Sequence, residues 1–363
     1  MRNLTAVRPA LLLTLWMTLL VTACSQGGNN GPIAEGATAG NLTEDTVETA
    51  DTEGRDAAPA EPSAAYASPL TGLPLQAEST VRPVAVMINN FGPARPQSGL
   101  PQADMVWEVL AEGGITRLVA IFQSDAFTGP IGPIRSIRPY LIDIAESFGS
   151  IIAHAGGSQD AYAILQRRDK PYLDEITNAS GFFYRDKSRK APHNLYSSLD
   201  KLREAADKKG YDATASVPVF RFMETAAPPA GADATAIELQ FMLKNYKVSY
   251  AYDAATQLYS RSVNGKPHTD RTSGEQLKAA NLVVLSAAHK VLDDEGRLEV
   301  DLQSGGPAIL FQLGKAVEAT WERGGDGVIR IMKDGSELPF VPGKTYYHVV
   351  PNDTPLAGHV TYQ

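Results

Sequence analysis

The sequence predicts an α/β N-terminal domain followed by a smaller, mainly-β C-terminal domain with a sandwich or barrel-like form. Residues 66–228 mix short strand-like apolar runs with segments of helical spacing. Residues 233–363 consist of short extended runs separated by turn signals. The segment AAPPAGA at 226–232 separates these two parts, and about 300 residues are more than one core usually serves. We therefore predict two domains, 66–228 and 233–363.

Residues 1–23 have the pattern of a lipoprotein signal peptide. Arg2 and Arg8 precede the apolar run ALLLTLWMTLLV, which ends shortly before Cys24. This run is too short to cross roughly 30 Å of hydrocarbon as a helix, which takes about 20 residues. The run VTAC at 21–24 resembles the lipobox of bacterial lipoproteins, which implies that Cys24 is lipidated. We expect an extracytoplasmic protein that is lipid-anchored to the cell membrane, with an ordinary unpaired cysteine as the alternative.

Residues 24–65 are predicted to form a disordered acidic tether. Positions 25–65 contain no aromatic residue, and eight acidic residues stand against one basic residue. Such a composition cannot offset the entropy cost of chain ordering. Since this segment carries −7 and the signal segment +2, the formal net charge of −8 leaves −3 for residues 66–363. The nearly neutral folded part argues against nucleic-acid binding, and any anion site in it must be local.

The N-terminal domain is predicted to alternate strands and helices. Extended runs at 105–111 and 115–122 flank Gly113-Gly114 and predict a hairpin. Helical spacing follows at 139–148, a short strand at 150–154, and a second helix at 159–168.

A third helix is expected to begin after Ser197 or Ser198 and to run through Lys208, with Gly210 at its end. The C-terminal domain then opens with a candidate helix at 235–244. Extended runs such as YKVSYAY, NLVVLSA and TYYHVV fill the remainder, and Asn264-Gly265 and Asp334-Gly335 mark turns. This part is therefore expected to be mainly β.

Several motifs of both parts resemble the YerB-like bacterial lipoproteins. They are GGITRLVAIF, GPIRSIRP, HAGGS and APHNLY in the first part, and NLVV, GKAVEATWE and PGKTYYHVVP in the second. The resemblance covers about residues 66–355. It implies an N-terminal domain and a smaller C-terminal domain behind a lipid anchor, mainly in Gram-positive and related bacteria. It supplies no mechanism.

The loop GPIRSIRP at 132–139 is the first candidate element of a binding site. Its Arg135, Ser136 and Arg138 lie between two prolines, which restrict the backbone. Each guanidinium presents a planar array of donors that matches a carboxylate or a phosphate. A different interpretation is that both arginines pair with acids near in sequence, and the candidates are Asp125, Asp143 and Glu146.

The motif HAGGS at 154–158 is the second element. Gly156 and Gly157 allow a ligand to approach the backbone, and Ser158 at a helix start aims N–H groups at an anion. His154 is a candidate base or phosphate donor. The alternatives are an ordinary helix cap and a satisfied buried histidine.

A basic loop and one strand residue complete the candidate site. The loop YRDKSRKAPHNLY contributes Arg185, Arg189, His193 and Asn194, and Arg117 belongs to the predicted strand at 115–122. A solvated basic loop is the alternative. We expect these segments to converge on one anion-binding cleft.

The motifs favour binding over a recognisable reaction. No His-Glu-x-x-His, cysteine pair, Walker A or dinucleotide fingerprint occurs, so we expect no metal and no cofactor. The leading hypothesis is a surface lipoprotein that binds an anionic envelope ligand, with the β domain as support or as a docking surface for a partner protein. The alternative is a metal-dependent phosphotransferase or hydrolase acting on a lipid-linked or polymeric envelope glycan. A third possibility is a structural protein whose arginines form internal salt bridges.

Overall fold

The computed structural model describes residues 66–124, 127–167 and 170–363, all within one compact unit, Ala60–Gln363. The signal segment 1–23, Cys24 and the tether 24–65 lie outside the described residues, and the predictions made for them are not tested by the fold.

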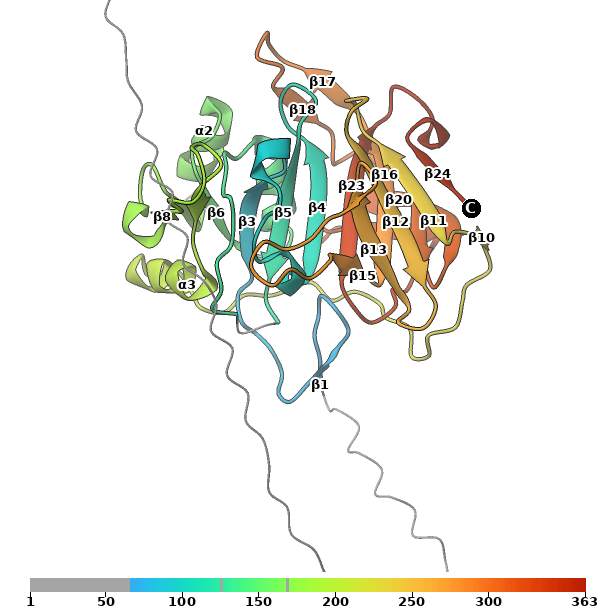
Figure 1. Cartoon of the computed structure of the whole chain (residues 1–363). Helices are drawn as coiled ribbons and strands as arrows, with labels where there is room; N and C mark the ends of the chain where they lie inside the picture. The colour runs from blue at the N-terminus through green and yellow to red at the C-terminus, as the bar shows by residue number, and fades with distance from the viewer. Residues whose placement is uncertain (1–65, 125–126, 168–169) are drawn as a thin grey trace, which may run out of the picture. The chain divides into compact units, whose positions relative to one another are not determined.

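A large mixed sheet forms the centre of this unit (Figure 1). Its path starts in the C-terminal part of the chain and ends in the N-terminal part. In order, the strands are β22 (Ser336–Glu337), β21 (Ile329–Lys333), β20 (Lys315–Arg323), β19 (Gly306–Gln312), β16 (Asn281–Ala287), β23 (Thr345–Pro351), β4 (Met105–Leu110), β5 (Thr116–Phe122), β3 (Val84–Asn89), β6 (Ile151–His154) and β7 (Tyr172–Asp174), while β10 (Ala232–Asp233) pairs with β20.

Strands β23 and β4 join the two parts of the chain. They pair in parallel, with Tyr347 opposite Trp107. The rings of these two residues stack with centroids 3.9 Å apart and planes 3° from parallel. Both side chains are buried, so the aromatic pair belongs to a hydrophobic core that continues from one part into the other. The segments on either side of the 226–232 break therefore share one sheet, which the sequence did not predict.

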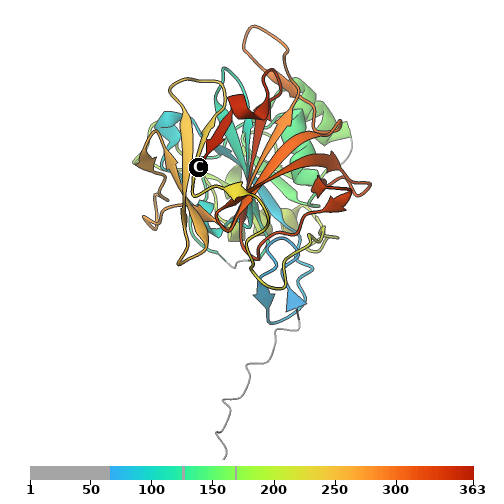
Figure 2. The same cartoon turned by 90° about the vertical axis from the view of Figure 1, so that its right-hand side faces the viewer.

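A six-stranded sheet covers the C-terminal portion of the large sheet (Figure 2). Phe311 of β19 contacts Tyr362 of β24, with ring centroids 5.3 Å apart between the layers. The strands are β14 (Lys266–Pro267), β13 (Leu258–Val263), β12 (Lys247–Asp253), β11 (Ala236–Gln240) and β24 (Val360–Tyr362), with β15 (Lys278–Ala279) paired to β13.

The prediction of a helix at 235–244 is wrong, because the first half of this segment forms strand β11. Ile237 and Leu239 point into the core, while Glu238 between them is exposed. This period of two fits a strand with one buried face, whereas a helix would separate the two apolar side chains.

Three helices accompany the N-terminal strands, and their predicted positions are confirmed to within two residues. They are α1 (Pro139–Glu146), α2 (Gln159–Arg167) and α3 (Leu199–Lys208). Ser198 caps α3 by accepting a hydrogen bond from the Lys201 N–H at 3.4 Å. The predicted hairpin is also confirmed, since β4 and β5 are antiparallel and Gly113 and Gly114 both have positive φ.

Shorter elements complete the fold. Three two-stranded ribbons are formed by β1 (Tyr66–Ala67) with β2 (Pro74–Leu75), β8 (Tyr184–Arg185) with β9 (Leu195–Tyr196), and β17 (His289–Val291) with β18 (Leu298–Val300). The 3₁₀ turns are η1 (Gly92–Ala94), η2 (Leu100–Gln102), η3 (Ser180–Phe182) and η4 (Leu356–Gly358).

Candidate functional site

The predicted site residues lie near one edge of the large sheet. Strands β3, β6 and β7 are parallel, so their carboxyl ends, at Asn89, His154 and Asp174, face the same edge. Strand β5 runs the other way and begins there, with Arg117 opposite Asn89. The carboxyl edge of parallel strands is the usual ligand position in open α/β sheets. The local topology is therefore suited to a binding site.

The loop 132–138 is held between the ends of β3 and β6. The Arg135 N–H donates to the Met87 carbonyl at 2.9 Å, and the Ala155 N–H donates to the Arg135 carbonyl at 3.1 Å. Further along, the Ile137 N–H donates to the Gly156 carbonyl at 3.0 Å. Where β3 and β6 diverge, their backbone N–H and C=O groups have no partner in the sheet. The loop satisfies these groups by hydrogen bonding to them. The loop backbone, and with it the starting point of the Arg135 side chain, is consequently fixed.

Glu112, in the turn between β4 and β5, pairs with two of the predicted arginines. One carboxylate oxygen lies 2.9 Å from Arg117 Nη2, and the other lies 2.9 Å from Arg138 Nη2. Burial lowers the pKa of Arg117 to about 10, while Glu112 opposes this shift. Asp125, Asp143 and Glu146 were the partners expected from nearness in sequence, but the carboxylate that binds Arg138 is Glu112.

Arg135 differs from these two arginines. Its side chain is half-buried, and its Nε atom is buried without a hydrogen-bond partner. No hydrogen bond or ion pair of its guanidinium is found among residues 66–124, 127–167 and 170–363. The positive charges of Arg135 and Arg138 both act on Arg117, so the three guanidinium groups are near one another. One carboxylate thus balances two of three clustered cations.

His193 lies beside Arg135. The Asn89 Nδ2 group lies 2.9 Å from His193 Nδ1, and Asn89 Oδ1 accepts the Phe91 N–H at 3.0 Å. Because Oδ1 is already an acceptor, the amide points its donor at Nδ1, and the neutral ring carries its proton on Nε2. Desolvation lowers the pKa of His193, and the charges of Arg135 and Arg189 lower it further. His193 therefore offers an N–H donor near Arg135 without adding a charge.

The other arginines of the basic loop form hydrogen bonds and an ion pair that keep this loop in place. Arg189 donates from Nη1 to the Pro96 carbonyl and the Tyr196 hydroxyl, both at 2.8 Å, and from Nη2 to the Pro93 carbonyl at 2.8 Å. Arg185 pairs with Glu175 at 3.3 Å and donates to the Asn194 side chain at 3.3 Å.

The HAGGS motif is closed off by the neighbouring loop. His154 is 0% exposed, and its Nδ1 atom lies 2.9 Å from the Gly156 carbonyl and 3.6 Å from Asp174. At Gly157 an added Cβ would lie 2.9 Å from the Ile137 side chain, and the Ser158 N–H already donates to the Ile137 carbonyl at 3.4 Å. The N-terminus of α2 is therefore covered by loop 132–138, and Ser136 is the part of that loop beside Gly156.

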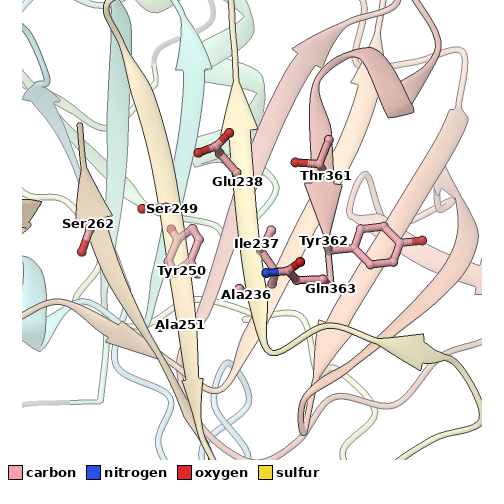
Figure 3. Close-up of a pocket in the computed structure, with 10 residues that line it drawn as sticks. All are labelled: Ala236, Ile237, Glu238, Ser249, Tyr250, Ala251, Ser262, Thr361, Tyr362 and Gln363. Carbon is pink, nitrogen blue, oxygen red and sulfur yellow. The ribbon is translucent and has the colours of Figure 1, made fainter. Parts of the chain in front are cut away.

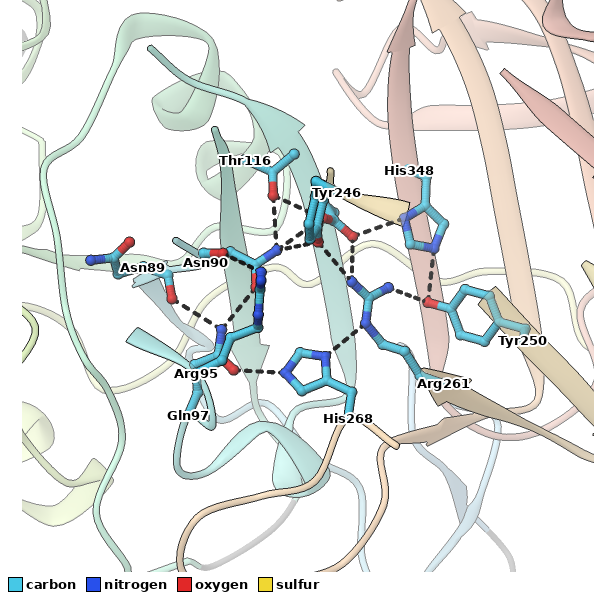
Figure 4. Close-up of polar contacts among 11 residues, drawn as sticks. Asn89, Asn90, Arg95, Gln97, Thr116, Tyr246, Tyr250, Arg261, His268 and His348 are labelled. Carbon is cyan, nitrogen blue, oxygen red and sulfur yellow. Dashed lines mark hydrogen bonds and ion pairs between the residues drawn. The ribbon is translucent and has the colours of Figure 1, made fainter. Parts of the chain in front are cut away.

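A buried polar network that the sequence analysis missed joins the two parts of the chain (Figure 4). Its centre is Glu108 of β4, which is 1% exposed and lies 2.8 Å from Arg261 Nη2 of β13. Glu108 also accepts hydrogen bonds from Tyr246 and Asn90, and it lies 3.2 Å from His348 Nδ1. These contacts hold the pKa of Glu108 below its usual value despite burial, and they hold the pKa of Arg261 above its usual value.

The histidine of this network that faces Arg261 is neutral. His268 Nδ1 accepts from Arg261 Nε at 3.0 Å, and its Nε2 group lies 2.7 Å from the side-chain oxygen Oε1 of Gln97. Burial, followed by the charge of Arg261, holds the pKa of His268 well below its ordinary value. The only sequence signal for this network was a titratable residue inside each of two apolar strands, MVWEVL and TYYHVV, together with an arginine in LYSRSV.

A shallow hollow of about 490 Å³ lies on the outer face of the six-stranded sheet (Figure 3). Small side chains line it, among them Ala236, Ser249, Ala251 and Ser262. Its carboxylate, Glu238, is already paired with Lys247 at 2.8 Å. None of the predicted site residues lies there, and its chemistry does not indicate a ligand class.

Two family models match the chain. They are described as the N-terminal and C-terminal domains of "Protein of unknown function (DUF3048)", and they match residues 70–212 and 237–347. A Bacillus subtilis (strain 168) protein named "Putative lipoprotein YerB" is 39% identical over 288 residues, 78% of this chain and 86% of that protein. The chain belongs to the YerB-like family. The resemblance found in the sequence is confirmed.

The YerB-like assignment extends to three dimensions. The crystal structure of the YerB protein from Bacillus subtilis matches with a TM-score of 0.75 and 37% identity over 82% of this chain and 99% of that chain. In the present YerB-like chain the DUF3048 boundary does not interrupt the large sheet, and the Glu108 network bonds residues of both family domains.

Two further properties bear on function. Within the part of the chain that the structure describes, no helix has the length and apolar character needed to cross a membrane. The same residues contain no group of three or more His, Cys, Asp or Glu side chains placed to hold a metal ion.

Proposed function

We propose that this chain is a lipid-anchored cell-surface protein of the bacterial envelope that binds an anionic ligand at Arg135. The lipoprotein name of the Bacillus subtilis relative supports the anchor, and so do the apolar segment and Cys24 at the N-terminus. The ligand group is a phosphate or a carboxylate. The observation that carries the proposal is the half-buried Arg135 guanidinium, which has no protein partner among the described residues.

A half-buried arginine without a hydrogen-bond partner destabilises the protein unless a ligand binds it. Desolvating part of a guanidinium without a hydrogen-bond partner costs free energy, and removing a partner from a charged group costs at least about 1–3 kcal/mol. The backbone of loop 132–138 is bonded to β3 and β6, which keeps Arg135 in this environment. An anion that accepts from its Nη–H groups would satisfy these donors in the bidentate geometry that arginine favours.

The surrounding charges favour an anion. Arg117 and Arg138 carry two positive charges against the one negative charge of Glu112, and Arg135 adds a third positive charge. The local excess of two positive charges contrasts with the small net negative charge of residues 66–363. At an effective dielectric constant near 20, each additional unit charge within a few ångströms contributes several kcal/mol of attraction. We therefore assign to Arg117 and Arg138 the role of raising the positive electrostatic potential at the anion site.

Neutral donors complete the proposed contact. The Nε2–H group of His193 is free once Asn89 occupies Nδ1, and the half-buried Ser136 hydroxyl follows Arg135 in the same loop. His154, Arg185, Arg189 and Asn194 are not included in the contact, because the first is fully buried and the others bond within the protein.

A calorimetric titration tests this proposal. The full-length protein is titrated with pyrophosphate and, separately, with tricarballylate in low-salt buffer, so that phosphate and carboxylate ligands are distinguished. We expect Arg135→Gln to weaken binding of the preferred anion at least about tenfold, since a hydrogen bond to a charged group contributes about 1.5–3 kcal/mol.

Arg203 in α3 provides the matched control. It is also half-buried, and two of its guanidinium nitrogens have no partner among the described residues, but it is not among the groups that act most strongly on Arg117. Arg203→Gln is expected to leave the affinity unchanged. Equal losses in both variants, or no binding of either anion by the wild-type protein, would refute the proposal.

A further inference from the structure

A second hollow, separate from the Arg135 cluster, lies between the two family domains. Its volume is about 390 Å³, which is within the range of small-molecule sites. The N-terminal domain supplies one wall through β8 and β9, and the C-terminal domain supplies the other through a loop after β14. The lining residues are Ser98, Pro130, Tyr184, Asp186, Tyr196, Arg271 and Thr272.

The wall from the C-terminal domain is held firmly in place. The Arg271 N–H donates to the Gln97 carbonyl at 2.7 Å, and the Asp270 carboxylate accepts the Gly99 N–H at 2.7 Å. Asp270 also accepts the Thr272 N–H at 2.8 Å. The two walls are therefore connected by hydrogen bonds, of which the one between Gly99 and Asp270 is buried, and the hollow is formed before any ligand arrives.

Tyr184 gives the hollow an aromatic surface, and the buried Tyr196 packs beside it. The rings of Tyr184 and Tyr196 lie 6.1 Å apart at 28°, and Tyr184 remains 40% exposed. The Tyr196 hydroxyl accepts from Arg189, and the Lys201 ammonium group lies 5.0 Å from the Tyr184 ring centroid. Both rings are thus positioned by neighbouring cations. A large exposed aromatic side chain held in this way offers a flat apolar surface to a ligand.

The charged groups of the hollow, Arg271 and Asp186, are joined through the Ser188 hydroxyl, which accepts from Arg271 Nη2 at 3.0 Å and donates to Asp186 Oδ1 at 2.6 Å. Arg271 Nε lies 3.9 Å from Asp186 Oδ2, which is too long for a hydrogen bond. Asp186 Oδ1 accepts the Ser188 N–H at 2.8 Å, and these Ser188 bonds lower the pKa of Asp186. The carboxylate therefore stays charged with one oxygen available. The Thr272 and Ser98 hydroxyls lie beside this pair, 3.0 Å from each other.

The side chains that line the hollow indicate which class of ligand it can bind. The lining residues include one carboxylate and one guanidinium group, so the lining itself has no net charge. A carboxylate accepts hydrogen bonds from neighbouring hydroxyls, a guanidinium donates to ring or hydroxyl oxygens, and an aromatic ring packs on a face of C–H groups. A pyranose ring presents all three features. We propose that this hollow, formed by Tyr184, Asp186 and Arg271, binds a neutral sugar residue.

The sugar site is independent of the Arg135 anion site. None of the residues that line the hollow belongs to the proposed anion contact of Arg135, Ser136 and His193. The proposal therefore does not depend on anion binding. Arg135→Gln should leave sugar binding intact, so the failure of either proposal can be recognised separately.

Saturation-transfer NMR with titration provides the test. The full-length protein is titrated with three uncharged trisaccharides, those of N-acetylglucosamine, α-1,4-linked glucose and β-1,4-linked glucose. We expect at least one of them to bind, with saturation transferred to its ring C–H protons. Tyr184→Ala and Asp186→Asn should each weaken that binding at least about tenfold. Asn at position 186 can still accept the Ser188 N–H, so the turn is preserved.

The chain offers a matched control for each variant. Tyr66 is 45% exposed and lies outside the hollow, so Tyr66→Ala removes an equally exposed ring. Asp253 accepts the Ala255 N–H at 2.9 Å in a turn like that of Asp186, so Asp253→Asn repeats the change of charge elsewhere. Unchanged affinity in both controls supports the site. Failure of all three sugars to bind, or equal losses in variants and controls, overturns it.

Discussion

Glu108 and Arg261 form a buried ion pair across the two family domains, with Oε2 and Nη2 2.8 Å apart and both side chains no more than 2% exposed. Glu108 lies on β4 and Arg261 on β13, so the pair joins the large sheet to the six-stranded sheet. Two charges this deeply buried are tolerable only while each remains fully bonded.

Removing one member of this pair is expected to destabilise the fold strongly. Glu108→Gln leaves the Arg261 charge buried without a counter-ion, which typically costs 3–5 kcal/mol. Urea unfolding of the wild-type and variant proteins measures the change in the free energy of unfolding. Glu238→Gln is the control, because its pair with Lys247 is about half exposed and such pairs contribute about 0–1 kcal/mol. A loss below about 1 kcal/mol for Glu108→Gln contradicts the interpretation.

Acid should destabilise the protein through its neutral buried histidines. Burial lowers the pKa of His268 and of His348 in the folded state, while the unfolded chain takes up protons below about pH 6.5. The unfolded state then binds more protons, so stability falls as the pH decreases from 7.5 to 5.5. His268→Gln should lower stability at pH 7.5 but reduce this slope by up to about 1.4 kcal/mol per pH unit. An unchanged slope in urea unfolding would count against a neutral His268.

Local signals predicted the local elements of the fold. The Gly113-Gly114 turn and the Ser198 cap are encoded within a few residues, and the hairpin and α3 were found where these signals predict. The pairing of β4 with β23 joins residues more than 200 positions apart. No local pattern encodes such a register, which explains why the shared sheet was not predicted.

The candidate site was predicted in a similar, partial way. The arginine-rich motifs predicted a cluster of positive side chains, and the fold places Arg117, Arg135 and Arg138 near one another. Their charge partners could not be deduced. Glu112 lies in the hairpin turn, 26 residues from Arg138, and only the fold brings it to Arg138, whereas the acids considered beforehand were near the loop in sequence.

Neutralising Glu112 should strengthen anion binding. Glu112→Gln removes the negative charge that balances Arg117 and Arg138, which raises the positive potential at Arg135. We expect pyrophosphate affinity to increase about two- to tenfold in low salt, with a smaller gain at higher salt because of screening. The variant should also unfold at lower urea concentration, since Arg117 is fully buried. Weaker or unchanged pyrophosphate binding in calorimetry would argue against a raised positive potential at the site.

The lipid anchor is expected to depend on Cys24. Cys24→Ser in the full chain removes the only thiol and therefore the acceptor for a thioether-linked lipid. We expect the protein to move from the membrane fraction to the soluble fraction, as measured by immunoblotting after cell fractionation, and to lose labelling with a clickable fatty acid. Ser25→Ala serves as the neighbouring control. Labelling that persists in Cys24→Ser would rule out this anchor.

A crystal structure of the protein soaked with pyrophosphate tests the anion site most directly. The expected result is phosphate density about 3 Å from the Arg135 guanidinium, within reach of Ser136 and the His193 ring. Density elsewhere with an empty Arg135 environment, or an Arg135 side chain turned to pair with a protein carboxylate, would contradict the proposed site.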